Sequence, residues 1–199
     1  DFKFEDITDF AGVAGTKSWS TGVSIADINA DGFLDIYVSN SGDIKGDNKQ
    51  NELYINNGDL TFTEMAADYG LDDTGYSTHA AFFDYDRDGD LDCYLLNNSY
   101  KGGFRITNIG TNQRPIRDSV GGDKLFRNDD GYFNDVSEES GIYGSVIGFG
   151  LGVTVGDVNN DGWMDIYVSN DFFERDYLYI NNADGTFSEE LEYQIKSIS

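Results

Sequence analysis

The chain has 199 residues, of which 39% are hydrophobic, and it contains 24 glycines and one proline. With 37 acidic against 13 basic side chains, its formal net charge is −24, which repels phosphate backbones and argues against a nucleic acid partner. A single cysteine, Cys93, excludes a disulfide framework within the chain, and no apolar run is long enough to span a membrane. This composition is typical of a compact protein of many short strands and tight turns.

An acidic pattern of nine residues occurs three times. Residues 27–35 read DINADGFLD, residues 84–92 read DYDRDGDLD and residues 157–165 read DVNNDGWMD, so all three fit D-x-D/N-x-D-G-x-x-D. Oxygen-bearing side chains at alternating positions, followed by a glycine for a sharp turn, are what a small loop needs to wrap a hard cation. The pattern predicts three calcium sites, with acidic hairpin turns that bind no metal as the alternative. Magnesium is disfavoured because it demands tighter octahedral geometry.

Strand-like segments surround each loop at matching positions. An inner strand precedes each loop, at residues 19–26, 76–83 and 149–156. A second strand follows each loop, at residues 36–38, 93–95 and 166–168, and a third strand lies at residues 53–55, 125–127 and 178–180. A fourth strand is predicted around Phe62, Phe133 and Phe187. Four short strands joined by hairpin turns make one antiparallel blade, and serial blades predict an all-β fold, a β-propeller.

The repeats divide the chain into three blades and one orphan outer strand. Phe4 is followed eight residues later by a glycine, as are Phe62 and Phe133, so residues 1–13 are predicted to be the outer strand of a preceding blade. The blades themselves are predicted at residues 14–71, 72–142 and 143–199. Because propellers close with four to eight blades, we expect the chain to be a fragment of a longer propeller.

The residues around the loops resemble a known family. The stretch FGLGVTVGDVNNDGWMD, at residues 149–165, is similar to the FG-GAP or VCBS repeat of integrin-α-type propellers. The segments NELYINNGDLTF and DYLYINNADGTF resemble repeats of ASPIC/UnbV proteins related to cartilage acidic protein. The resemblance covers essentially the entire chain and implies a seven-bladed, calcium-binding propeller that serves recognition or scaffolding. It also implies an exported bacterial protein that is extracellular or at the cell surface, associated with the outer membrane.

The resemblance implies five oxygen ligands in each loop, four from side chains and one from a backbone carbonyl. These are Asp27, Asn29, Asp31 and Asp35 with the carbonyl of Phe33; Asp84, Asp86, Asp88 and Asp92 with the carbonyl of Asp90; and Asp157, Asn159, Asp161 and Asp165 with the carbonyl of Trp163. Because the second loop carries the most carboxylates, we expect it to bind calcium most tightly. Each ion is predicted to tie the hairpin between two strands, which couples the stability of a blade to metal binding.

A long insertion interrupts the second blade at residues 99–122. It contains four basic residues in an otherwise acidic chain, the candidate partner-binding residues Lys101, Arg105, Arg114 and Arg117. A cationic loop on an acidic scaffold is a place where a protein, a carboxylated sugar or a neighbouring acidic subunit can dock. Alternatively, the insertion crosses the face of the propeller and pairs with aspartates of its own chain.

The sequence contains no visible nucleophilic or zinc-binding constellation. The one histidine, His79, is predicted to be a packed strand residue or a ligand contact near the propeller axis, and Cys93 is predicted to be buried. We therefore expect a non-catalytic, calcium-stabilised module that binds a protein or carbohydrate partner, or a subunit of a larger surface complex. The alternative is part of a calcium-dependent propeller enzyme acting on polysaccharide, a lyase or hydrolase, in which His79 or Arg105 and Arg117 converge in a cleft beside the insertion.

Overall fold

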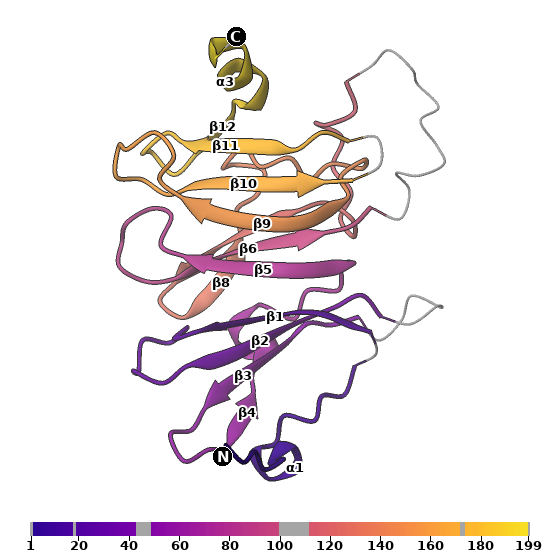
Figure 1. Cartoon of the computed structure of the whole chain (residues 1–199), viewed down its shortest axis with the longest axis vertical. Helices are drawn as coiled ribbons and strands as arrows, with labels where there is room; N and C mark the ends of the chain where they lie inside the picture. Colours follow the sequence, from indigo (N-terminus) through magenta and orange to yellow (C-terminus); the bar gives the residue numbers. More distant parts are fainter. Residues whose placement is uncertain (1, 18, 43–48, 100–111, 172–173, 199) are drawn as a thin grey trace.

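The computed structural model describes residues 2–17, 19–42, 49–99, 112–171 and 174–198. The strands form three separate four-stranded antiparallel sheets, and each sheet is built from strands that are consecutive in the chain. Figure 1 shows the three sheets stacked along the long axis of the molecule, and the described strands do not close into a ring. This is the arrangement of neighbouring propeller blades, so the predicted all-β propeller fold is confirmed.

Within each sheet the strands follow one another from the inner edge to the outer edge. The first sheet contains β1 (Ser20–Ala26), β2 (Asp35–Asn40), β3 (Glu52–Asn56) and β4 (Phe62–Glu64). The second sheet contains β5 (Ser77–Phe83), β6 (Asp92–Asn97), β7 (Lys124–Asp129) and β8 (Tyr132–Asp135). The third sheet contains β9 (Gly150–Gly156), β10 (Asp165–Asn170), β11 (Tyr177–Asn181) and β12 (Phe187–Glu189). Each inner strand begins one residue later than predicted, and the other strand segments predicted within the three blades lie within observed strands.

The hydrophobic core lies between neighbouring sheets. Tyr37 of β2 is fully buried, and its ring meets Phe82 of the second sheet edge-on with 5.5 Å between ring centroids. Tyr94 occupies the same place in β6 and is also fully buried, against Tyr179 of the third sheet. The third copy, Tyr167 of β10, is 38% exposed because the described residues place no further sheet against it. The face of the third sheet that carries Tyr167 is therefore open, whereas the corresponding faces of the first and second sheets are covered by the next sheet.

Cys93 is fully buried in the cluster between the first and second sheets, as predicted, and burial raises the pKa of its thiol well above the ordinary value. A buried neutral thiol acts as a small hydrophobic side chain.

Two short helices end at a glycine in the left-handed conformation. After β4, α2 (Ala66–Tyr69) ends at Gly70, whose φ of 74° is the left-handed conformation that glycine adopts readily. The N-terminal α1 (Thr8–Ala11) ends in the same way at Gly12. Residues 2–7 form no strand, because a single strand with no sheet beside it leaves its backbone groups unpaired. The predicted outer strand over residues 1–13 is thus not formed among the described residues, and its assignment to a preceding blade stays a prediction.

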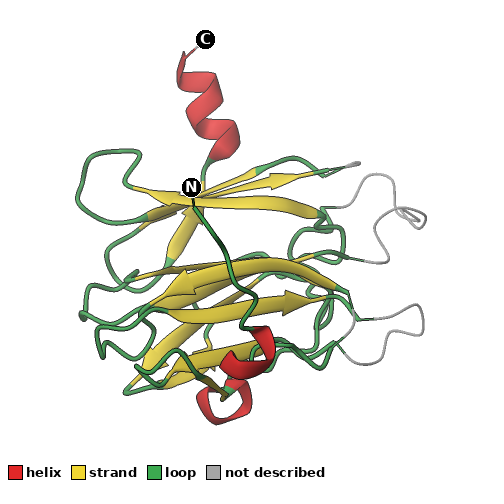
Figure 2. Cartoon of the chain, turned by 60° about the horizontal axis from the view of Figure 1, so that its bottom comes forward, coloured by secondary structure: helices red, strands yellow, loops and turns green. Residues whose placement is uncertain are grey.

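The third helix, α3 (Leu191–Ile198), follows β12 and projects beyond the third sheet in Figure 1. Figure 2 shows all three helices at the periphery of the stacked sheets. The strands therefore carry most of the core, to which Ala66 of α2 also contributes.

Polar braces hold the end of each sheet that lies opposite the acidic loops. In the first sheet Asn51 accepts a hydrogen bond from the backbone N–H of Asn40 at 2.8 Å and donates one to the Tyr37 hydroxyl at 2.9 Å. Asp123 takes that place in the second sheet and accepts both corresponding bonds, at 2.9 and 3.0 Å. Burial raises the pKa of Asp123 to about 7. The buried aspartate of the second sheet thus bonds the same two groups, a backbone N–H and a tyrosine hydroxyl, that an asparagine bonds in the first sheet.

Replacing this aspartate, Asp123→Asn, is expected to remove part of the pH dependence of stability. The pKa of Asp123 in the folded state lies above its ordinary value near 3.8, so the folded state binds the proton more tightly than the unfolded state does. The free energy of unfolding therefore falls as the pH rises from about 4 to about 7. The neutral amide removes this loss, and Asn51 shows that the brace accommodates an asparagine.

Urea unfolding of both proteins at several values between about pH 4.5 and about pH 8 measures the effect. As the pH rises over this range, the unfolding free energy of Asp123→Asn should increase relative to that of the unchanged protein by roughly 2–4 kcal/mol. The matched control is Asp176→Asn, because Asp176 holds the same place in the third sheet but is partly exposed. A difference that does not change with pH contradicts the prediction.

Candidate metal centre

The three acidic loops join the first two strands of each sheet and lie on the same side of the stack (Figure 1). Two positions in each loop adopt the left-handed conformation. The fourth residues, Ala30, Arg87 and Asn160, have φ values of 57°, 64° and 61°. The sixth residues, Gly32, Gly89 and Gly162, have φ values of 91°, 104° and 89°, which favour glycine. These two positions curl the backbone around the first aspartate of each loop.

In the first loop, the predicted ligands lie together. The carboxylate of Asp27 accepts the backbone N–H groups of Asp31 and Gly32, at 3.0 and 2.9 Å. Asn29 donates its side-chain amide to Asp31 Oδ2 at 2.9 Å. The third loop repeats these bonds at 3.1, 2.9 and 2.8 Å, among Asp157, Asn159, Asp161 and Gly162. In both loops an asparagine amide offsets part of the repulsion between carboxylates.

The second loop instead gathers carboxylates alone. Oxygens of Asp84, Asp86 and Asp88 lie within 4.8 Å of one another. Asp84 Oδ1 and Asp90 Oδ1 are buried and accept no hydrogen bond among the described residues. Burial, followed by the charge of Asp88, raises the pKa of Asp86 and raises the pKa of Asp90 to about 6. Unpartnered oxygens and converging negative charges are both costly, and a hard divalent cation removes both costs. The second loop therefore fits a calcium ion.

The last aspartate of each loop is buried and ties the loop to the third strand of its sheet. Asp35 accepts the backbone N–H of Ile28, within the loop, and of Asn56, at the end of β3, both at 2.9 Å. Asp92 and Asp165 accept the same pair of bonds in their own sheets, at 2.9–3.0 Å. Burial raises the pKa of Asp92 to about 7. These three predicted ligands therefore also have a structural role that does not depend on a metal.

An asparagine that was not predicted from the sequence closes each loop against its sheet. The Asn56 side chain donates to the carbonyl of Leu34, the eighth residue of the first loop, at 3.0 Å. Asn128 and Asn181 make the corresponding bond, both at 3.3 Å. The signal was present, because an asparagine follows the third strand in all three copies. Only the structure shows that this side chain supports the loop.

The described basic residues of the insertion contact their own chain. Arg114 forms an ion pair with Glu174, at 2.6 Å between Nε and Oε1, and the Glu174 side chain is only 1% exposed. Arg117 donates to a backbone carbonyl 2.9 Å away. Lys101 and Arg105 lie outside the described residues. These contacts favour the alternative that the insertion pairs with its own chain, and a partner-binding role for the four basic residues stays a prediction.

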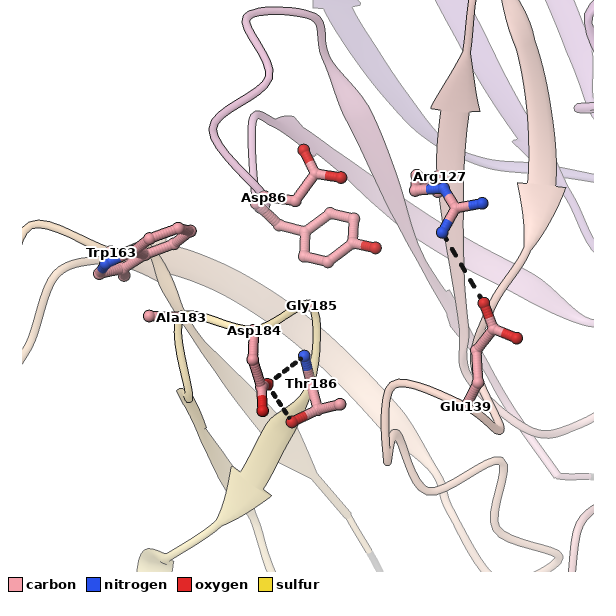
Figure 3. Close-up of a pocket in the computed structure, with 9 residues that line it drawn as sticks. Asp86, Arg127, Glu139, Trp163, Ala183, Asp184, Gly185 and Thr186 are labelled. Carbon is pink, nitrogen blue, oxygen red and sulfur yellow. Dashed lines mark hydrogen bonds and ion pairs between the residues drawn. The ribbon is translucent and has the colours of Figure 1, made fainter.

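A groove of about 440 Å³ opens beside the second and third loops (Figure 3). Its lining combines the aromatic side chain of Trp163 with the carboxylates of Asp86 and Asp184. On the opposite wall, Arg127 faces Glu139 with 3.8 Å between Nη1 and Oε1. The groove therefore offers both a flat apolar surface and polar groups.

Two models of repeat families match the chain, one of them at three places. The sequence model described as FG-GAP-like repeat matches residues 41–95, 116–168 and 157–198, and that of the FG-GAP repeat matches residues 19–55. The chain belongs to the FG-GAP-like repeat family. FG-GAP repeats build binding or scaffolding propeller modules, often bind calcium and are typical of extracellular proteins. The finer resemblance to ASPIC/UnbV proteins stays a prediction.

Comparison with curated protein sequences gave no match. Among solved structures, the chain is similar to a lectin of Agrocybe aegerita that specifically recognises non-reducing terminal N-acetylglucosamine. The identity is 20%, the TM-score is 0.44, and the match covers 83% of this chain and 36% of the lectin. This FG-GAP chain thus spans about a third of the length of that protein. None of the helices in the described part of the chain combines the length and hydrophobicity that crossing a membrane requires.

Proposed function

We propose that this FG-GAP chain is a calcium-stabilised, non-catalytic module that binds a protein or glycan partner outside the cell or at the cell surface. The observation that carries the proposal is the second loop, where Asp84, Asp86 and Asp88 cluster and where Asp84 Oδ1 and Asp90 Oδ1 are buried without a hydrogen-bond partner among the described residues. The fifteen predicted ligands would hold one ion in each loop. A bound ion supplies the positive charge that lets these oxygens converge, and it ties the first two strands of a blade together.

Charge supports the same proposal. The chain carries a formal net charge of −24, and the three loops hold 11 of its aspartates. Three divalent ions would bring the net charge to about −18, with the compensation placed where the negative charge is densest. Export, surface attachment and association with the outer membrane belong to this proposal through the family resemblance.

The positions of the remaining candidate side chains support binding over catalysis. His79 of β5 lies beside Gly22 of the first sheet, 3.2 Å from the place a Cβ on that glycine would occupy. Arg117 instead lies against Gly144, which precedes the third sheet. The two residues that an enzyme would bring together thus have different neighbours. The groove beside Trp163 offers the aromatic and polar surface that sugars and polar peptides use.

Isothermal titration calorimetry with calcium tests the proposal. We expect three ions bound per chain, with Asp84→Ala in the second loop reducing the number to two. The matched control is Asp130→Ala, an exposed aspartate beside the same loop that is not a predicted ligand. Absence of calcium binding overturns the metal part of the proposal. Release of new reducing ends or unsaturated uronates from polysaccharides overturns the non-catalytic part.

Binding to a glycan array, measured with calcium and with EDTA, tests the partner. Calcium-dependent retention of defined glycans supports a glycan partner. If no glycan is retained with calcium or with EDTA, the proposal of a glycan partner is wrong, and the proposal of a protein partner remains.

A further inference from the structure

Four buried residues connect the second loop to the third. The N–H of Tyr85 donates to Asp92 Oδ2 at 2.9 Å, and the carbonyl of Tyr85 accepts a bond from Asn181 Nδ2 at 2.8 Å. The N–H of Asn181 then donates to Asp165 Oδ1 at 2.9 Å. Each of the four residues is at most 3% exposed. Asp92 and Asp165 are predicted ligands of different loops, so three buried hydrogen bonds, which we name the Tyr85–Asn181 relay, join two candidate sites.

A contact at the surface joins the same two loops. The guanidinium of Arg87, in the second loop, lies over the ring of Trp163, in the third loop, with 5.1 Å to the ring centroid. It also lies against Gly162, the turn glycine of the third loop. The backbone N–H of Trp163 donates to Asp161 Oδ1 at 2.8 Å, so the residue that carries this ring is bonded to a predicted ligand. A cation–π contact therefore adds to the relay.

The first and second loops lack both connections. Ala30 and Asp90 occupy the places of the arginine and the tryptophan, and they cannot form a cation–π contact. Asn128, the counterpart of Asn181, donates its side chain to Leu91 of its own loop, and no bond to the carbonyl of Ile28 forms among the described residues. A groove of about 600 Å³, lined by Ile28 and Asn128, separates these loops. Among the described residues, no hydrogen-bonded relay of this kind joins the first loop to the second.

We propose that calcium binds cooperatively to the second and third loops and independently to the first. This inference rests on the proposed function. Calcium at the second loop would add a further contact to Asp92, whose position the Tyr85–Asn181 relay links to that of the Asp165 carboxylate. The third loop then loses less conformational freedom when it binds, which strengthens its affinity. By thermodynamic linkage, the third loop strengthens binding at the second loop by the same factor.

The turn glycines give each loop its own reporter. The amides of Gly32, Gly89 and Gly162 donate to the first aspartates of their loops, at 2.9, 3.2 and 2.9 Å. Their ¹H–¹⁵N signals will shift as each loop fills, so one calcium titration yields three binding curves.

The first test disables the second loop with Asp86→Ala. We expect the calcium midpoint at Gly162 to rise about fivefold, while the midpoint at Gly32 stays the same. The reverse variant, Asp161→Ala, should raise the midpoint at Gly89 by the same factor. Repulsion between two bound cations would have the opposite sign, because emptying one loop would then tighten the other. Unchanged or tighter binding at Gly162 therefore overturns the inference, as does an equal change at Gly32.

The second test removes the relay with Asn181→Ala. In this background, Asp86→Ala should leave the midpoint at Gly162 unchanged. Asn56→Ala is the matched control, because the Asn56 side chain supports the first loop in the same way but is bonded to its own loop, and this variant should preserve the coupling. Full coupling in Asn181→Ala overturns the relay. If Asn181→Ala does not fold, the first test decides alone, because it leaves Asn181 intact.

These outcomes separate the inference from the proposed function. If no glycine signal responds to calcium, both the proposed function and the inference fail. If all three signals respond with independent midpoints, the inference alone fails.

Discussion

Removing calcium with EDTA is expected to lower the melting temperature of this chain by about 15–30 °C. A ligand present at 100 times its Kd stabilises the folded state by about 2.7 kcal/mol per site, and three sites together contribute about 8 kcal/mol. For a chain of this size each kcal/mol corresponds to about 2–4 °C. Circular dichroism during heating, in calcium and in EDTA, measures the shift.

Magnesium and a charge control make this experiment specific. Magnesium at the same concentration as calcium should recover less than half of the melting temperature that is lost in EDTA. The reason is that magnesium requires near-ideal octahedral geometry, whereas the loops supply flexible oxygen ligands. Asp88→Asn, in the carboxylate cluster, should reduce the calcium shift, whereas Asp130→Asn, which removes the same charge from an exposed position nearby, should not. Equal melting temperatures in calcium and EDTA mean that the loops do not bind calcium in the folded state.

The sequence was sufficient to locate the blades because each strand is anchored to a turn with strict requirements. A left-handed glycine and an aspartate at fixed intervals occupy the same places in each loop, so the start of each flanking strand could be predicted to within one residue. The convergence of Asp84, Asp86 and Asp88 follows from the same spacing. These features depend on residues that are close together in the sequence, so a single sequence is enough to predict them.

Contacts between blades could not be predicted in this way. Asn181 and Tyr85 are 96 residues apart, and their hydrogen bond depends on how the second and third sheets stack. Arg114 was predicted as a candidate docking residue, but its partner Glu174 lies 60 residues away. Periodicity identifies which side chains face a neighbouring blade, whereas the pairing across that interface depends on the angle and offset between sheets.

The dual role of the last loop aspartate leads to a second large effect. In EDTA, Asp165→Ala is expected to lower the free energy of unfolding by about 2–4 kcal/mol. The variant loses the acceptor for the backbone N–H groups of Val158 and Asn181, both at 2.9 Å from a carboxylate that is almost fully buried. A buried N–H without an acceptor costs about 1–3 kcal/mol. Urea unfolding without metal measures this loss.

Asp161→Ala provides the comparison, because Asp161 is a predicted ligand of the same loop but is exposed to solvent. Water can replace its hydrogen bonds, so in EDTA this variant should lose less than about 1 kcal/mol. In calcium, both variants should also lose the stabilisation that the third ion supplies. Equal losses in EDTA would mean that Asp165 serves only the metal, whereas the expected difference assigns it a second role in joining the loop to β11.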